Sequence, residues 1–172
     1  IDSLIEAGVD DIEHGSGIDA DQASEIAARG IAVTPTLRQV ELFKDFAAQA
    51  GQKYPVYAAT MRGMYETRRE HFQMLVDSGV VLLMGTDSGG YQEHGTIAGE
   101  LALWLQWGAP VQFTIDAATW ASQRYLGYPG LVDGGPADFL ILDEDPRDDV
   151  LALSRPARVT LGGTTVWERT SA

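Results

Sequence analysis

Two polar residues, His14 and Asp87, each follow a short run of residues that favours a β-strand. His14 comes after residues 9–13, and Asp87 comes shortly after the apolar run at 80–84. Imidazole and carboxylate groups bind divalent metals and transfer protons. Taken alone, each also has a structural explanation, because a strand-end histidine often only forms hydrogen bonds and an aspartate often caps a turn. Together they favour a hydrolytic site over that explanation.

The other candidate groups have weaker positions. His94 precedes Gly95 and a helix, so it could approach the same site or lie in a surface loop. His71 lies within a long helical pattern, and we expect it on the helix surface, far from any strand end. The glycine-rich run at residues 85–90 lacks the lysine of a phosphate loop, and its central carboxylate would repel phosphate.

The elements that would hold these residues alternate between helix and strand. Helical patterns cover residues 1–8, 21–29, 37–50, 56–78, 96–107 and 110–126, and strand patterns cover 9–13, 31–34 and 80–84. This alternation predicts an α/β fold with a parallel sheet, in which His14 and Asp87 project from the same end of the strands. The run at 80–84 is apolar throughout, which predicts a strand buried on both faces.

The end of the chain has a different pattern. Short β-prone runs cover residues 137–142, 158–161 and 164–167. Gly162 and Gly163 separate the last two runs, which is a strong signal for a hairpin. We therefore expect a separate small sheet there.

Composition excludes several classes of function. The chain has 172 residues, of which 45% are hydrophobic and 22% charged, and its net charge is −13. Such an acidic globular chain is a poor partner for nucleic acid or an anionic membrane. It has no cysteine, which excludes thiol catalysis and fits a reducing compartment, so we expect a cytoplasmic protein.

Several segments occur in an order that resembles the metal-dependent amidohydrolases, and most of all their imidazolonepropionase-like and Xaa-Pro dipeptidase-like members. They are SLIEAGVDDIEHGSGID, ARGIAVTPTL, LVDSGVVLLMGTDSGG, GLVDGGPADFLILDEDP and VTLGGTTVW. The resemblance implies strands six to eight of a (β/α)₈ barrel in residues 1–128, and strands of a small β-sandwich in 129–172. It also implies that the chain is the C-terminal half of a longer protein.

The resemblance implies roles for the two strand-end residues. His14 matches a strand-six histidine that binds metal or orients substrate, and Asp87 matches a strand-eight aspartate that binds metal and acts as acid and base. One or two divalent ions, most often zinc, would activate water to hydrolyse an amide, a dipeptide or a cyclic amide. Arg38, Tyr91 and His94 are candidates for contacting a small-molecule substrate.

The other metal ligands of that family have no counterpart in this chain, because they belong to strands one, four and five. We therefore expect the isolated chain to be inactive, and its open strand edges to associate with the missing half or with a second copy. Two alternatives remain open. The chain could be a non-catalytic α/β binding or structural module, or the same scaffold could serve a lactonase or phosphoesterase.

Overall fold

The computed structural model describes residues 1–170 and divides into two compact units, Ile1–Ala109 and Pro110–Ala172. We call them the first and second unit. The two helices after Pro110 belong to the second unit in this division. The domain boundary expected between residues 128 and 129 stays a prediction.

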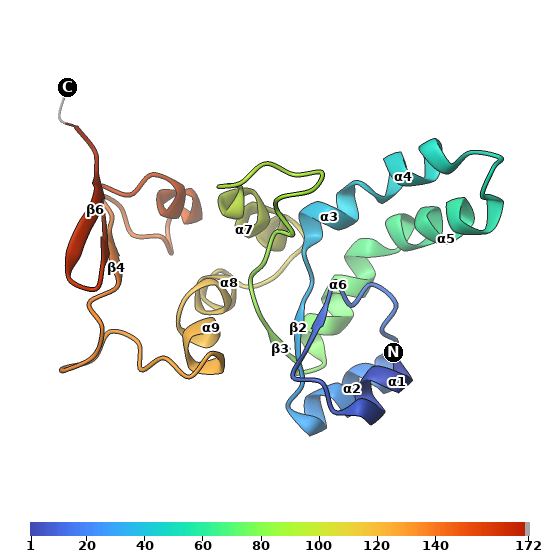
Figure 1. The fold of residues 1–172 in the computed structure, drawn as a ribbon, viewed down its shortest axis with the longest axis horizontal. Helices are drawn as coiled ribbons and strands as arrows, with labels where there is room; N and C mark the ends of the chain where they lie inside the picture. Colours follow the sequence, from blue (N-terminus) through green and yellow to red (C-terminus); the bar gives the residue numbers. More distant parts are fainter. Residues whose placement is uncertain (171–172) are drawn as a thin grey trace. The chain divides into compact units, whose positions relative to one another are not determined.

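The first unit is built on a three-stranded parallel sheet (Figure 1). Its strands are β1 (Asp11–Glu13), β2 (Ala32–Thr34) and β3 (Val81–Leu82), in the order β1-β2-β3. Both outer strands run parallel to β2, so the carboxyl ends of all three lie at one edge of the sheet. The predicted α/β alternation is confirmed.

One face of this sheet belongs to the core. Ile12 pairs with Val33, which pairs with Leu82, and all three side chains are buried. Val81 points to the opposite face and is 41% exposed. The expectation of a strand buried on both faces was therefore wrong, because no described element fully covers that side of β3.

Seven helices surround or extend this sheet within the described residues. They are α1 (Asp2–Ala7), α2 (Ala20–Arg29), α3 (Leu37–Glu41), α4 (Phe43–Ala50), α5 (Pro55–Glu66), α6 (Arg68–Asp77) and α7 (Ile97–Gln106). Aromatic packing joins α6 to α7, since the rings of Phe72 and Trp104 meet edge-on with centroids 5.1 Å apart.

Two of these helix pairs were predicted as single helices. The segment 37–50 divides at Leu42, whose N–H donates to the Gln39 carbonyl and so tightens the turn. The segment 56–78 divides at Thr67, whose hydroxyl donates to the Gly63 carbonyl at 3.1 Å. Side-chain hydrogen bonds to backbone carbonyls compete with a continuous helix.

The second unit contains α8 (Val111–Ala118), α9 (Trp120–Tyr125), a 3₁₀ helix (Val150–Ser154) and an antiparallel sheet. The sheet has the order β4 (Phe139–Ile141), β5 (Arg158–Leu161) and β6 (Thr164–Glu168). Gly162 and Gly163 form the turn between β5 and β6 with φ values of 53° and 77°. The predicted hairpin and separate sheet are confirmed.

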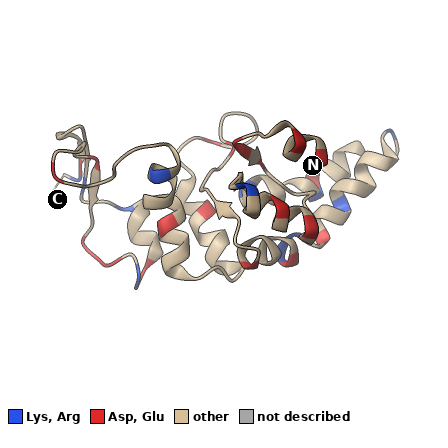
Figure 2. Cartoon of the chain, turned by 90° about the horizontal axis from the view of Figure 1, so that it is seen from below, with Lys and Arg blue, Asp and Glu red and all other residues tan. Residues whose placement is uncertain are grey.

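Acidic residues outnumber basic ones along the chain (Figure 2). Of the helices formed by residues 1–170, none has the length and apolar character needed to cross a membrane.

Candidate functional site

Strained backbone marks the carboxyl ends of all three parallel strands. Within residues 1–170 the only non-glycine residues with positive φ are His14, Thr36 and Asp87, at 65°, 46° and 54°. They follow β1, β2 and β3 in turn. Such conformations are costly for residues with a β-carbon and cluster at functional sites. The strand ends are therefore the leading candidate for a site.

His14 is held at the end of β1 by its backbone and by the glycine after it. Its N–H donates to the Thr34 carbonyl at 2.8 Å, which extends the β1–β2 ladder by one residue. Gly15 follows with φ 58°, and a β-carbon there would lie 2.8 Å from both Ile18 Cδ1 and Val33 Cγ1. Only glycine lets the chain turn this closely over the core.

The imidazole of His14 is half-buried and oriented by Thr36. Its Nδ1 lies 2.7 Å from the Thr36 hydroxyl oxygen. Within residues 1–170 its Nε2 has no hydrogen-bond partner. This nitrogen is therefore available to a ligand from outside the described chain.

Asp87 lies in the loop that follows β3. Its side chain is exposed, and it forms no hydrogen bond or ion pair with any residue in the range 1–170. Both strand-end groups act on the carboxyl of Glu13. Burial raises the pKa of Glu13, Asp11 and Asp87 raise it further, and His14 lowers it. The two candidate groups thus influence one neighbourhood, although the described residues include no cluster of three or more His, Asp or Glu suited to a metal.

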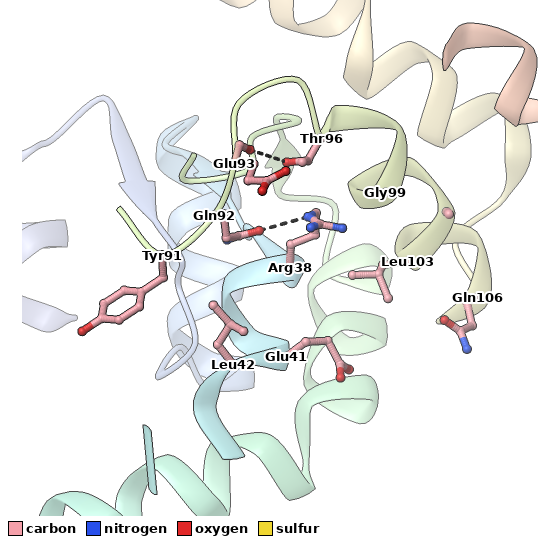
Figure 3. Close-up of a pocket in the computed structure, with 11 residues that line it drawn as sticks. Arg38, Glu41, Leu42, Tyr91, Gln92, Glu93, Thr96, Gly99, Leu103 and Gln106 are labelled. Atoms are coloured by element: carbon pink, nitrogen blue, oxygen red, sulfur yellow. Dashed lines mark hydrogen bonds between the residues drawn. The ribbon is translucent and has the colours of Figure 1, made fainter. Parts of the chain in front are cut away.

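The predicted substrate residues Arg38 and Tyr91 line a cavity of about 490 Å³ beside the loop that carries Asp87 (Figure 3). The cavity is also lined by Glu41, Leu42, Gln92, Glu93, Thr96, Gly99, Ala102, Leu103 and Gln106. Tyr91 is 76% exposed and packs its ring on Phe46, with centroids 5.0 Å apart. Figure 3 shows its ring pointing away from Arg38.

Gln92 connects Arg38 to the loop of Asp87. Arg38 Nε donates to Gln92 Oε1 at 3.0 Å, and Gln92 Nε2 donates to the Thr86 carbonyl at 2.9 Å. The terminal guanidinium nitrogens of Arg38 have no hydrogen-bond partner within residues 1–170. They remain free to bind an anionic group.

The other two histidines occupy different surroundings. His94 is exposed and does not line this cavity, but its ring lies near Gly89 in the Asp87 loop. His71 is half-buried, and its Nε2 lies 2.9 Å from the Ile18 carbonyl. Both His71 and His14 line a small cavity of about 10 Å³. The expectation that His71 lies on a helix surface far from any strand end was wrong, because α6 packs toward the segment that follows His14.

Sequence reasoning also missed Glu100. This glutamate is fully buried, and its carboxylate accepts hydrogen bonds from the Leu37 and Arg38 N–H groups at 2.7 and 2.8 Å and from Trp104 Nε1 at 3.0 Å. Burial raises its pKa, while these hydrogen bonds oppose that rise. An acidic residue within the otherwise apolar helix 97–106 was the available signal.

Comparison with known proteins identifies the family of the chain. The family model of the amidohydrolase family matches residues 2–166. The chain therefore belongs to the amidohydrolase family. It is 40% identical over 162 residues to Rv2915c of Mycobacterium tuberculosis and to Mb2939c of Mycobacterium bovis, both uncharacterized proteins. The match covers 94% of this chain and 44% of each relative, so the chain spans less than half their length.

Solved structures share the fold. A Xaa-Pro dipeptidase crystallised with methionine in its active site is 24% identical, with a TM-score of 0.82 over 98% of this chain and 42% of that one. The ochratoxinase of A. niger is 23% identical, with a TM-score of 0.79 over 97% and 39%. A prolidase in complex with N-methylphosphonate-L-proline is 25% identical, with a TM-score of 0.78 over 96% and 42%.

Proposed function

We propose that this chain is the C-terminal part of a metal-dependent hydrolase that cleaves a C–N bond in an amide, a dipeptide or a cyclic amide. The observation that carries the proposal is the strained backbone at three successive strand ends, with His14 and Asp87 at two of them. Membership of the amidohydrolase family supports the same assignment. In this proposal β1, β2 and β3 are strands six to eight of a (β/α)₈ barrel.

The donor types fit a divalent metal such as zinc. His14 has a free Nε2, and Asp87 has a carboxylate without a partner within residues 1–170. Imidazole nitrogen and carboxylate oxygen are both zinc ligands, and a catalytic zinc usually takes three protein ligands. The remaining ligands would come from the part of the longer protein that precedes this chain.

A divalent metal, when bound, would lower the pKa of a water molecule and, as a Lewis acid, polarise the scissile carbonyl. Asp87 would accept the proton of the attacking water on a carboxylate oxygen and transfer it to the leaving nitrogen. Its exposed side chain leaves that oxygen accessible to substrate. His14 would bind the metal or donate a hydrogen bond to the carbonyl oxygen.

The substrate in this proposal is a small molecule. Arg38 would bind a carboxylate through its free terminal nitrogens, and Tyr91 would line the adjoining wall of the 490 Å³ cavity. His94 would approach from the same loop as Asp87. The cavity connects to that loop through Gln92, so substrate binding and the acid–base group would share one segment of chain.

The test is Asp87→Asn in the full-length protein, compared with Asp77→Asn. Asparagine keeps the size of aspartate but cannot accept the proton, so kcat should fall by at least about 100-fold. Asp77 is an exposed aspartate at the end of α6 that has no part in the proposed site, so its replacement should leave kcat unchanged. Turnover is measured with dipeptides, N-acyl amino acids, cyclic amides, lactones and phosphoesters, before and after chelation and zinc addition.

Normal turnover by Asp87→Asn with metal bound would refute the role of Asp87. A full-length protein that binds no metal stoichiometrically would instead favour the non-catalytic module. Turnover restricted to lactones or phosphoesters would replace the C–N bond as the target.

A further inference from the structure

We propose that Thr36 is a positioning residue that fixes the imidazole of His14 with Nε2 unprotonated and directed to its ligand. The proposal rests on the proposed function only where it names that ligand as a metal. Its structural part concerns the tautomer of His14, which can be measured without any metal.

The contact between the two side chains is short, and it joins a half-buried histidine to a buried threonine. His14 Nδ1 lies 2.7 Å from Thr36 Oγ1, and Thr36 is only 1% exposed. If Nδ1–H donates to this oxygen, Nε2 carries the lone pair that a metal requires. Hydrogen bonds of this kind orient metal-binding histidines and set their tautomer.

The backbone of Thr36 is an unusual place for a threonine. Its φ and ψ are 46° and 56°, in the left-handed region. A β-branched residue is a genuine outlier there, and glycine or asparagine would be the undemanding choices. The presence of a strained threonine is explained by its hydroxyl, which neither glycine nor an aliphatic residue would supply to His14.

The surrounding structure holds Thr36 in this conformation. The next two residues, Leu37 and Arg38, donate their N–H groups to the buried carboxylate of Glu100. The Thr36 carbonyl in turn accepts from the Gln39 and Val40 N–H groups, at 2.9 and 3.2 Å. The start of α3 is therefore anchored at Glu100, and Thr36 is held where its hydroxyl meets the ring of His14.

The test compares Thr36→Val with Thr36→Ser in the full-length protein. Valine keeps the β-branched shape and removes the hydroxyl, whereas serine keeps the hydroxyl. Histidine ¹⁵N chemical shifts are measured on the metal-free protein at one alkaline pH, and the His14 signals are identified by their absence from His14→Gln. The wild type and Thr36→Ser should each show a single His14 tautomer, with Nε2 unprotonated. Thr36→Val should show a mixture.

Zinc affinity gives the second measurement. Thr36→Val should bind zinc about 10- to 100-fold more weakly than the wild type, and Thr36→Ser should recover to within a few-fold. Thr34→Val is the matched control, because that buried threonine donates its hydroxyl to Asp11 and not to His14. It should leave the His14 tautomer unchanged.

An unchanged tautomer and unchanged zinc affinity in Thr36→Val would overturn the proposal. If Thr36→Val does not fold, Thr36→Gly makes the same comparison, since glycine adopts this backbone without strain. Failure of the wild type to bind zinc or any other divalent metal would refute the proposed function alone. A tautomer change in Thr36→Val would still support the positioning role of Thr36.

Discussion

The sheets of the two units are buried to very different extents. All three residues of β2 in the first unit are buried, whereas all five residues of β6 in the second unit are exposed. Large apolar side chains of the second sheet are accordingly accessible, namely Leu140, Ile141, Leu161, Val166 and Trp167. The comparison suggests that packing in the first unit supplies most of the stability and can therefore support strained strand ends.

The charged groups differ in the same way. In the first unit, burial is the main cause of the altered pKa values of Glu100 and His71. In the second unit, Asp145 is partly exposed, and hydrogen bonds from Arg147 lower its pKa to about 2. The pKa shifts of Glu100 and His71 thus depend on tertiary packing, whereas that of Asp145 depends on a neighbour two residues away.

Replacing one tryptophan in each unit should give the largest contrast. Trp104 is fully buried against Phe72 and donates to Glu100, so Trp104→Ala should cost about 3–5 kcal/mol of unfolding free energy. Trp167 is 47% exposed, and Trp167→Ala should cost no more than about 1 kcal/mol. Urea unfolding of both variants measures the difference, and equal losses would contradict the comparison.

Two glycines with positive φ give a smaller contrast. Gly15→Ala adds a clash with Ile18 and Val33 to the backbone strain, and should cost about 2–4 kcal/mol. At Gly162 a β-carbon meets nothing within 4 Å, so Gly162→Ala carries only the backbone cost of about 1–2 kcal/mol. Thermal unfolding of the pair tests whether packing against β2, rather than φ alone, separates them.

Local sequence patterns predicted the features that depend on neighbouring residues. Runs of β-prone residues followed by a polar residue correctly placed His14 and Asp87 after their strands. The pair of glycines correctly placed the β5–β6 hairpin. Both signals arise from backbone preferences within a few residues. The family resemblance added the expected roles of His14 and Asp87, which remain predictions.

Features that depend on distant residues were not predictable in this way. The burial of His71 depends on Ile18, which lies 53 positions earlier, and the role of Glu100 depends on N–H groups more than 60 positions away. The helix divisions at Leu42 and Thr67 have no glycine or proline at the break. Tertiary contacts decide such features, and no periodicity in the sequence encodes them.

The smallest expected effect concerns the pH dependence of stability in the first unit. Burial lowers the pKa of His71 below its usual 6.5. The unfolded chain therefore binds a proton before the folded chain does, and stability contributed by neutral His71 is lost as pH falls from about 6.5 toward the lower folded value. His71→Gln retains a donor for the Ile18 carbonyl but cannot titrate, so it should lose less stability over this range.

The difference between the wild type and His71→Gln should be less than about 1 kcal/mol, since the half-buried ring is partly screened by solvent. Glu100 has the opposite effect, because its raised pKa makes stability fall as pH rises above 4.5. Both proteins contain Glu100, so its contribution cancels when their stabilities are compared. His94→Gln is the matched control, because His94 is exposed. Asp145 should change the free energy of unfolding only below pH 3.8, because its stabilising negative charge is lost as pH falls toward about 2. Urea unfolding at pH 7 and pH 5 measures the effect, and identical pH dependence in the wild type and His71→Gln would show that packing of α6 does not control this histidine.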